Sequence, residues 1–174
     1  MDEGRWMELT ANQRADTGNS TAAERDLVHT FGQALGSNLE EVQRLDVEAY
    51  GDDAYSYMTL RQFLDITGEL FQVCKDVNGS VIAYGIIAQS ANQDSGWLLS
   101  LVVSLRHRRK GIGAALTRRL LDKASTYSFR EIFLTVATDN NAAISLYKEL
   151  GFTVVKIEHH YYVQNEDRIV MRRS

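Results

Sequence analysis

Apolar residues recur at helical spacing in four segments of the chain, with charged residues between them. The first segment starts with a capping residue, Ser37 or Asn38, and with the two acids of a capping box, Glu40 and Glu41. The last segment ends at Gly151, a residue type that commonly terminates helices. The predicted helices cover residues 38–50, 59–67, 112–127 and 142–150.

Six further segments are rich in β-prone residues and are predicted as strands, at residues 70–75, 81–88, 97–105, 131–138, 152–163 and 168–172. The first two flank Asp76-Val77-Asn78-Gly79, whose Asn-Gly pair favours a tight hairpin turn. The run 97–105 is almost continuously apolar, so we expect a central strand buried on both faces. Alternation at Leu27, His29 and Phe31 suggests an additional first strand, although the apolar residues there would also line a helix.

The order strand, helix, strand, helix between residues 97 and 150 is a crossover pattern, and together with the hairpin it predicts a mixed α/β sheet. Residues 1–23 are polar, small and aperiodic, so they are predicted to form a disordered or extended tail. Residues 24–174 are then one domain, long enough to bury a core without disulfides.

Composition excludes several classes of protein. A net charge of −4 and a pI near 5.6 argue against a nucleic-acid-binding protein, which needs a basic surface. The single cysteine, Cys74, cannot form an intrachain disulfide, and no cluster has metal-ligand spacing, so we expect a metal-free protein of the reducing cytoplasm. No run approaches the roughly 18 apolar residues of a membrane span.

The segment from Leu101 to Ala114 carries the first chemical signal. A strand leads into Arg108-Arg109-Lys110-Gly111-Ile112-Gly113-Ala114 and then a helix, which places glycines and free N–H groups at a helix N-terminus where a phosphate can bind. A Walker P-loop is excluded because Ala114 and Ala115 replace its Lys-Ser/Thr pair. A Rossmann fingerprint fits poorly because Leu116 stands where a third small residue is needed.

The stretch LVVSLRHRRKGIGAAL resembles the acetyl-CoA signature of the GNAT superfamily of N-acetyltransferases, R/Q-x-x-G-x-G/A after a strand, which Arg108, Gly111 and Gly113 match. The stretch from Asn140 to Phe152 is similar to a second signature of that family, N…A…Y…GF. The resemblance covers roughly residues 25–174. It implies a mixed, mostly antiparallel sheet of six or seven strands, a V-shaped splay between strands 4 and 5, and about four flanking helices.

By this resemblance, acetyl-CoA is the acyl donor and the residues from strand 97–105 to the following helix bind it. The backbone of Leu101 and Val103 would pair with the pantetheine arm, Asn140 would lie near the reactive end, and the Tyr147 hydroxyl would protonate the departing thiolate. The implied cofactor-binding residues are Leu101, Val103, Arg108, Arg109, Lys110, Gly111, Ile112, Gly113, Ala114, Asn140 and Tyr147.

The acceptor is less constrained by the sequence. Many family members carry a glutamate at the position aligned with Leu134-Thr135-Val136, where this chain has none, which leaves Glu69, Glu131 and His159 as bases acting through water. At pH 7 roughly a tenth of an α-amine is neutral, against less than about a thousandth of a lysine side chain, so an α-amine needs a weaker base. The tail from His160 to Met171 resembles that of ribosomal-protein and other N-terminal acetyltransferases.

Tyr55, Tyr57 and Tyr162 are the candidate acceptor-binding residues, with Tyr50 close by in the sequence. Packing alone would also account for these tyrosines. The predicted function is therefore transfer of an acetyl group to a primary amine, with a peptide N-terminus or a small amine, such as a polyamine, an antibiotic or an amino-acid derivative, as the acceptor. A non-catalytic acyl-CoA-binding module is the alternative of a different class, and a homodimer is compatible with these patterns.

Overall fold

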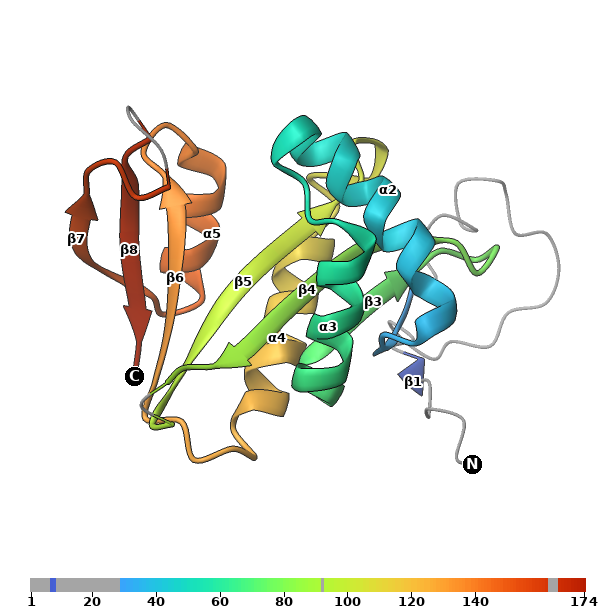
Figure 1. The fold of residues 1–174 in the computed structure, drawn as a ribbon, viewed down its shortest axis with the longest axis horizontal. Coiled ribbons are helices and arrows are strands. Elements are labelled where there is room, and N and C mark those ends of the chain that lie inside the picture. The colour runs from blue at the N-terminus through green and yellow to red at the C-terminus, as the bar shows by residue number, and fades with distance from the viewer. Residues whose placement is uncertain (1–6, 9–28, 92, 163–165) are drawn as a thin grey trace, which may run out of the picture.

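The computed structural model describes residues 7–8, 29–91, 93–162 and 166–174, and these form one twisted sheet with helices on both faces (Figure 1). Over the described residues the sheet has eight strands in the order β1-β2-β3-β4-β5-β6-β8-β7. The strands are β1 (Met7–Glu8), β2 (Thr30–Gln33), β3 (Phe71–Lys75), β4 (Val81–Gln89), β5 (Ser95–Val103), β6 (Glu131–Ala137), β7 (Thr153–Glu158) and β8 (Arg168–Arg173).

Neighbouring strands run antiparallel except for β5 and β6, which run parallel. The predicted mixed, mostly antiparallel sheet is therefore confirmed. The predicted strands 4 and 5 correspond to β5 and β6, because the two-residue β1 lies before the first predicted strand. The prediction for that first strand began at Leu27, which lies outside the described residues, and the part within them is β2.

Two pairs of helices cover opposite faces of the sheet (Figure 1). Helices α2 (Leu39–Tyr50) and α3 (Tyr57–Thr67) cover one face, and α4 (Ile112–Ala124) and α5 (Asn141–Glu149) cover the other. The residues at helical spacing in the sequence are buried as expected: Val42 and Leu45 of α2 in the first core, Leu116 and Leu120 of α4 in the second. Both cores use β4, so this strand is buried along most of its length.

The start of α2 differs from the predicted capping box. The Asn38 side chain accepts a hydrogen bond from Leu35 N (3.0 Å) instead of capping α2, and the Glu41 carboxylate accepts one from Val81 N in β4 (2.8 Å). A tertiary hydrogen bond has thus replaced the local one, and it ties α2 to the sheet. The hairpin between β3 and β4 is confirmed, closed by a hydrogen bond from Asp76 N to Ser80 O (3.0 Å).

Strands β5 and β6 pair over only four residues and then separate, as Figure 1 shows at the centre of the sheet. The ladder runs from Ser95↔Glu131 to Leu98↔Leu134. Directly after it, the pairing of β5 with β4 shifts register, since Ile87 opposes Leu98 whereas Ile86 opposes Ser100. Such a bulge bends a strand and ends its pairing on one side.

The expectation that β5 is buried on both faces is wrong for its second half. Leu98, Ser100 and Val102 are buried, but Leu99, Leu101 and Val103 are partly exposed. For Leu101 and Val103 the cause is the separation of the strands: beyond Leu98, no β6 backbone lies beside β5, and these two side chains border a cavity.

Candidate active site

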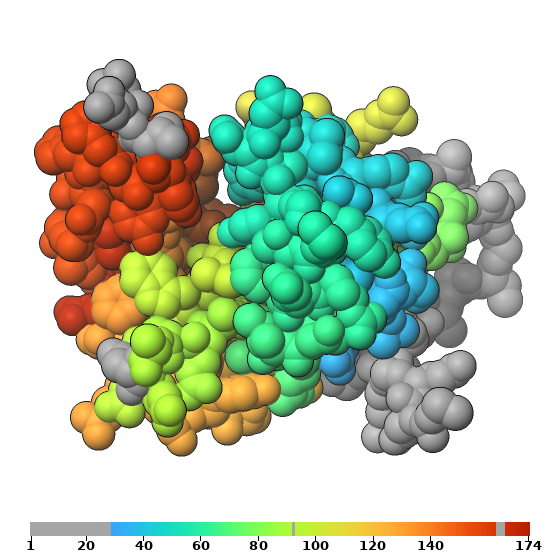
Figure 2. All heavy atoms as spheres, viewed as in Figure 1, coloured from blue at the N-terminus to red at the C-terminus, as the bar shows by residue number. Residues whose placement is uncertain are grey.

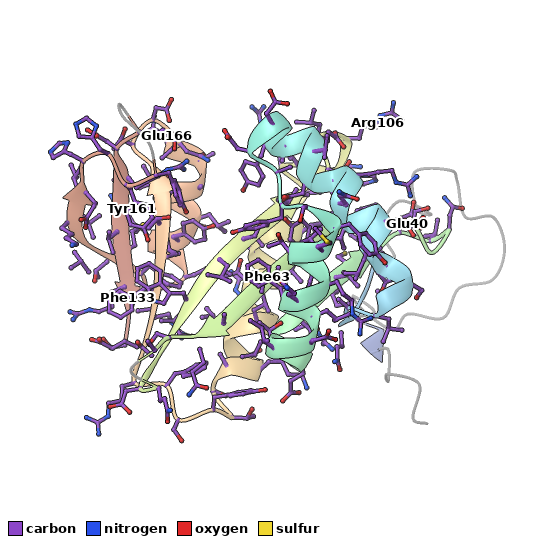
Figure 3. All side chains as sticks on the ribbon, viewed as in Figure 1. Glu40, Phe63, Arg106, Phe133, Tyr161 and Glu166 are labelled. Carbon is purple, nitrogen blue, oxygen red and sulfur yellow. The ribbon has the colours of Figure 1, made fainter. Side chains whose placement is uncertain are left out.

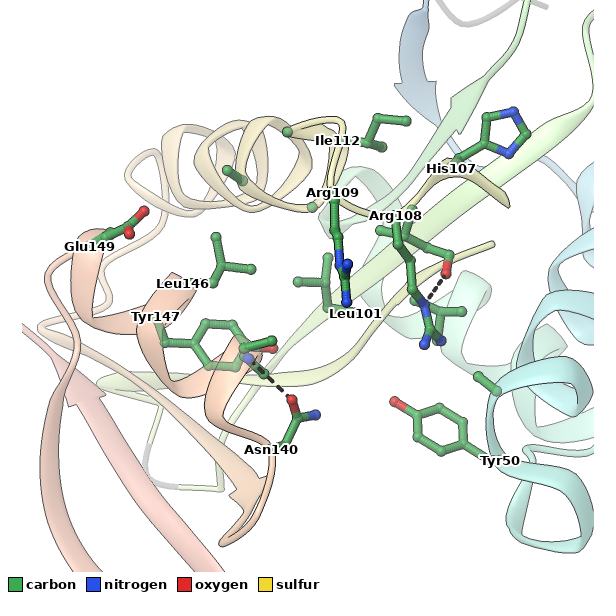
Figure 4. Close-up of a pocket in the computed structure, with 18 residues that line it drawn as sticks. Tyr50, Leu101, His107, Arg108, Arg109, Ile112, Asn140, Leu146, Tyr147 and Glu149 are labelled. Carbon is green, nitrogen blue, oxygen red and sulfur yellow. Dashed lines mark hydrogen bonds between the residues drawn. The ribbon is translucent and has the colours of Figure 1, made fainter. Parts of the chain in front are cut away.

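The gap between β5 and β6 opens into a cavity of about 710 Å³ (Figure 4). Its walls come from the second half of β5, the junction before α4 with the first turn of α4, one side of α5 and the C-terminal end of α2. The lining residues are Ala49, Tyr50, Leu101, Val102, Val103, His107, Arg108, Arg109, Gly111, Ile112, Gly113, Ala114, Asn140, Ala142, Ala143, Leu146, Tyr147 and Glu149. Segments far apart in the sequence, predicted to act together, therefore meet around one volume.

The junction between β5 and α4 presents backbone N–H groups to this cavity. Gly111 is the N-cap residue of α4 with φ +79°, Arg109 also has positive φ (+62°), and no side chain caps the helix. The first N–H groups of an α-helix have no intrahelical acceptor, and left-handed residues before a helix turn successive N–H groups toward one point. Together with the helix dipole, this arrangement suits a phosphate.

Two arginines flank the uncapped helix end. Arg108 donates from Nε to the carbonyl oxygen of Val103 (3.1 Å), which fixes its guanidinium at the end of β5, and Arg109 extends alongside it over the cavity (Figure 4). Of the predicted cofactor-binding residues, Lys110 does not line the cavity, whereas Leu101, Val103 and the rest do. Their roles toward a cofactor stay predictions.

Asn140 and Tyr147 form the opposite wall. Asn140 caps α5, its side-chain oxygen accepting from Ala143 N (3.1 Å), and Tyr147 lies one to two turns further along the same helix. The Tyr147 side chain is 8% exposed and packs edge-on against Phe152, with ring centroids 5.8 Å apart. Burial raises the pKa of Tyr147 well above its ordinary value of 10, and the hydroxyl of Tyr50 raises it further. The phenol therefore stays protonated at neutral pH.

Tyr50, the last residue of α2, reaches the cavity from the side opposite Tyr147, and in Figure 4 the two hydroxyls point toward one another. The sequence placed Tyr50 only among tyrosines near the acceptor. Its position at the end of a helix, after Ala49, gave no sign that it would face the residue proposed as the acid.

The contacts of the candidate acceptor-binding tyrosines involve α3 and the C-terminal strands, and Figure 2 shows a hollow between the C-terminal strands and helices α2 and α3. Tyr55 packs edge-on against Phe63 of α3 (5.1 Å between centroids), which Figure 3 places on one side of the hollow. Tyr161 lies on the other side and contacts Tyr162 edge-on (4.7 Å). The Arg168 guanidinium stacks over the Tyr162 ring at 5.0 Å.

Two of these tyrosines, Tyr55 and Tyr162, are close enough to affect one another electrostatically. Burial raises the pKa of Tyr55 to about 12, and the interaction with Tyr162 is the next largest cause of that rise. Tyr57, at the first turn of α3, is exposed and does not line the cavity. Tyr55 and Tyr162 do not line it either, and the role of these three tyrosines toward an acceptor stays a prediction.

The three residues considered as bases are engaged elsewhere. Glu69 forms an ion pair with Lys123 (2.8 Å), Glu131 with Arg172 (2.9 Å), and His159 contacts Asp167 (2.7 Å). None of them lines the cavity. Glu131 opens β6 at the closed end of the strand pair, the end away from Tyr147.

Sequence reasoning missed a buried polar chain behind this site. Asp46 of α2 is completely buried, as is Tyr84 of β4, whose hydroxyl donates a hydrogen bond to the Asp46 carboxylate. Ser100 of β5 donates to the Tyr84 hydroxyl (2.9 Å), and Tyr55 N donates to Asp46 (2.6 Å). The available signal was an acid at the i+4 position from Val42, inside an apolar helix stripe.

Within the described ranges, no group of three or more His, Cys, Asp or Glu side chains is arranged to hold a metal ion. Helices in the same ranges are too short or too polar to cross a membrane.

The site thus combines a separated parallel strand pair, an uncapped helix start that contains glycines, and a tyrosine on the facing helix. The family model described as "Acetyltransferase (GNAT) family" matches residues 37–152. The chain belongs to this family, and by class it is an acetyl-CoA-dependent acetyltransferase, as the resemblance predicted.

More particular similarities are to enzymes named for N-terminal acetylation. An N-alpha-acetyltransferase of Sulfolobus acidocaldarius is 28% identical over 160 residues, 86% of this chain and 94% of that protein. One of Sulfurisphaera tokodaii is 40% identical over 77 residues, so this match spans 44% of this chain and just 46% of that relative. The crystal structure of Ard1 from Thermoplasma volcanium has a TM-score of 0.76 and 25% identity, covering 83% of this chain and 96% of that one.

Proposed function

We propose that this protein transfers the acetyl group of acetyl-CoA to a primary amine, and that its acceptor is the N-terminal α-amine of a polypeptide. One observation carries the proposal: a single cavity joins an uncapped helix N-terminus, the separated second half of β5 and the buried hydroxyl of Tyr147. These are the three parts that holding a phosphate-bearing thioester and protonating its leaving group require.

The donor half of the site fits acetyl-CoA. The N–H groups from Arg109 to Ala114 and the guanidinium groups of Arg108 and Arg109 hold the pyrophosphate. Leu101 and Val103 offer backbone to an extended pantetheine arm, because β6 no longer pairs with β5 there. Asn140 lines the cavity and is already fixed through its capping hydrogen bond, which leaves its amide N–H₂ group as a donor for the reactive end.

The reaction consists of attack by the neutral amine nitrogen on the thioester carbonyl carbon, formation of the C–N bond and loss of the CoA thiolate. Tyr147 donates a hydrogen bond to the sulfur as the C–S bond breaks. Because burial holds the pKa of Tyr147 above that of a free phenol, the proton moves to sulfur only as the negative charge develops.

The acceptor half favours a polypeptide over a compact amine. Tyr55 packs against Phe63 of α3 and Tyr162 lies under Arg168 of β8, and the hollow between α3 and the C-terminal strands in Figure 2 suits an extended chain entering toward Tyr50. An α-amine is also the easier nucleophile at pH 7, since its pKa is lower than that of a lysine side chain. The similarity to enzymes named N-alpha-acetyltransferase supports the same acceptor.

The experiment is an acceptor panel assayed for CoA release and for acetylated product by mass spectrometry. It contains hexapeptides with different free N-terminal residues, matched hexapeptides with a blocked N-terminus and one lysine, and the small amines spermidine, kanamycin and glutamate. We expect the free N-terminal peptides to have the highest kcat/KM. Higher kcat/KM on a small amine would overturn the acceptor, and cofactor binding without turnover on any amine would overturn the enzymatic function.

The expected cytoplasmic location, homodimer and absence of nucleic-acid binding stay predictions. The single buried cysteine, Cys74, favours a reducing compartment, and acetyl-CoA must be present wherever the enzyme works.

A further inference from the structure

Two large aromatic side chains of the sheet stack on one another away from both cores. The rings of Trp97 in β5 and Phe133 in β6 have centroids 5.3 Å apart and planes inclined by 26°. Both side chains are partly exposed, and in the part of the chain that the structure describes neither belongs to or packs against the two clusters of buried residues. We call these two residues the aromatic pair. Exposed rings that lie together commonly mark a binding surface.

The register of the strands sets the direction in which the aromatic pair points. Trp97 lies opposite Phe133 in the parallel ladder, and the next residues, Leu98 and Leu134, belong to the core beneath α4 and α5. Because successive side chains of a strand point to opposite faces, the aromatic pair points to the face that carries α2 and α3. Helix α3 packs on β3 and β4, and among the described elements Figure 1 shows no helix over this face of β6, β8 and β7.

The same face of β8 connects the aromatic pair with one of the candidate acceptor tyrosines. Arg172 lies opposite Phe133, so the two side chains share a face of the sheet. Arg168 is four residues away on the same strand and therefore points to that face too. The Arg168 guanidinium stacks over the Tyr162 ring. A continuous sheet surface therefore runs from Tyr162 to the aromatic pair.

The aromatic pair lies in the hollow that is proposed for the acceptor. In Figure 3, Phe133 lies on the side of the C-terminal strands, below Tyr161, and Phe63 of α3 lies on the other side. Figure 2 shows this hollow at the molecular surface. Neither ring of the aromatic pair lines the cavity that fits acetyl-CoA. The surface is therefore available to the acceptor and not to the donor.

The distance between the aromatic pair and the cavity can be counted along β5. Leu101 lines the cavity together with Tyr147, and Trp97 precedes Leu101 by four residues. A strand rises about 3.3 Å per residue, so Trp97 and Leu101 are separated by about 13 Å along the strand. An extended polypeptide covers this distance in about four residues as well. A chain with its α-amine at the cavity therefore reaches the aromatic pair with its fourth or fifth residue.

We propose that the aromatic pair is a subsite that binds an apolar or aromatic side chain at the fourth or fifth residue of the acceptor polypeptide. This inference rests on the proposed acetylation of a polypeptide N-terminus. The rings offer apolar area on which such a side chain packs. The charge of the neighbouring Arg172 is balanced by its ion pair with Glu131 (2.9 Å), so the subsite does not favour an acidic side chain.

A subsite this far from the reacting atoms acts through binding. It holds the bound substrate and the transition state equally, so it lowers the KM of the acceptor and leaves kcat almost unchanged. Partial burial of one aromatic side chain on two rings corresponds to roughly a tenfold change in affinity. The choice of acceptor then depends on a residue well beyond the one that is acetylated.

The first test uses the wild-type protein alone. The acceptors are heptapeptides with the free N-terminal residue preferred in the acceptor panel, glycine and serine elsewhere, and one phenylalanine moved from position 3 to position 7. A heptapeptide without phenylalanine and a tripeptide with the same N-terminal residue complete the set. We expect a KM roughly tenfold lower with phenylalanine at position 4 or 5 than at position 7 or with none, and a kcat within about twofold throughout.

The second test removes one ring at a time, in Trp97→Ala and Phe133→Ala. Tyr127→Ala is the matched control, because Tyr127 also stacks on a phenylalanine, Phe129 (5.4 Å), but lies between α4 and β6, where Phe129 packs against the core beneath α4. The measured quantity is the ratio of kcat/KM for the position-5 heptapeptide to that for the tripeptide. It should fall roughly tenfold in both test variants and stay within about twofold of the wild type in the control. Thermal melts check that each variant is folded.

Tryptophan emission gives a readout that does not depend on turnover. The chain has two tryptophans, Trp6 and Trp97, so Trp6→Phe leaves Trp97 as the only emitter. This variant is saturated with CoA and titrated with the position-5 heptapeptide. The emission of Trp97 should change with a saturable dependence on peptide concentration, and the heptapeptide without phenylalanine should cause little change at the same concentrations.

A KM that does not depend on the position of phenylalanine, in peptides that are acetylated, would overturn the subsite and leave the proposed acetyl transfer intact. A wild-type protein that is dimeric by light scattering and monomeric as Phe133→Ala would also overturn it, because a second copy would then cover the aromatic pair. No turnover on any peptide with a free N-terminus would overturn the proposed acceptor and this subsite together.

Discussion

Replacing Gly111 by alanine tests whether the backbone shape before α4 binds the donor. Gly111 has φ +79°, and a Cβ added to it would meet no atom within 4 Å, so the substitution changes backbone preference without a steric clash. Gly79, in the β3–β4 hairpin, has φ +81° and equally open surroundings. Gly111→Ala and Gly79→Ala therefore make the same change in the same backbone conformation, but only Gly111 lines the cavity, so Gly79→Ala is the control.

The magnitude follows from the left-handed conformation. It costs an L-residue about 1–2 kcal/mol, so each variant should lose up to that much unfolding free energy, which is about 2–8 °C in melting temperature for a chain of this size. At the α4 junction the free protein can relax out of the left-handed conformation, and ligand binding must then restore it. A cost of 1–2 kcal/mol is a factor of about 5 to 30 in an equilibrium constant, so the Kd for CoA should rise by that factor in Gly111→Ala.

Isothermal titration with CoA and thermal melts with and without CoA measure both quantities. Gly79→Ala should bind CoA within about twofold of the wild type despite its lower stability. If Gly111→Ala also binds within twofold, the αL backbone at the α4 junction does not hold the phosphates, and the donor must be bound by the arginines or elsewhere.

Three further outcomes are expected. Acetyl-CoA at one hundred times its Kd should add about 2.7 kcal/mol to the unfolding free energy, and an unchanged melting temperature at saturating ligand would contradict the donor assignment. Tyr147→Phe should lower kcat by about 100-fold or more with a smaller effect on KM, measured with a fast acceptor; near-full turnover would make Tyr147 a packing residue. Because the folded-state pKa of Asp46 is raised above 3.8, its stabilising contribution is complete below that pH and is lost as the pH rises through the raised value. The unfolding free energy of the wild type minus that of Asp46→Asn should therefore fall with rising pH across this window, and a flat or rising difference in denaturant melts would show the sign to be wrong.

Much of the fold could be predicted because local and tertiary preferences agree. The stripes of α2 and α4 and the Asn-Gly hairpin each carry a pattern whose period matches the element formed. The exceptions arise where tertiary contacts outweigh local ones. Glu41 bonds to Val81 N across 40 positions of sequence instead of closing a capping box, and nothing in the local pattern encodes that partner.

The site divides in the same way. The glycines before α4 and the residues from Asn140 to Phe152 form contiguous motifs, and those motifs could be read directly. The buried hydrogen bonds from Ser100 to Tyr84 and from Tyr84 to Asp46 could not, because these residues lie on β5, β4 and α2, and only the packing of a helix on a bulged strand brings them together. An acid inside an apolar helix stripe indicates that a buried hydrogen-bond partner exists, but the sequence does not identify that partner.

The short ladder between β5 and β6 has a consequence for the choice of acyl group. Backbone hydrogen bonds fix the two strands at their closed end, over four residue pairs, whereas side chains alone shape the open end. Leu101, Leu146 and Tyr147 line this open end, and under the proposed function they set the room beside the thioester, although none of them belongs to the ladder. Substitutions among these residues can admit a longer acyl chain or exclude one without unpairing a strand, so donor selectivity in this fold can drift while its architecture stays constant.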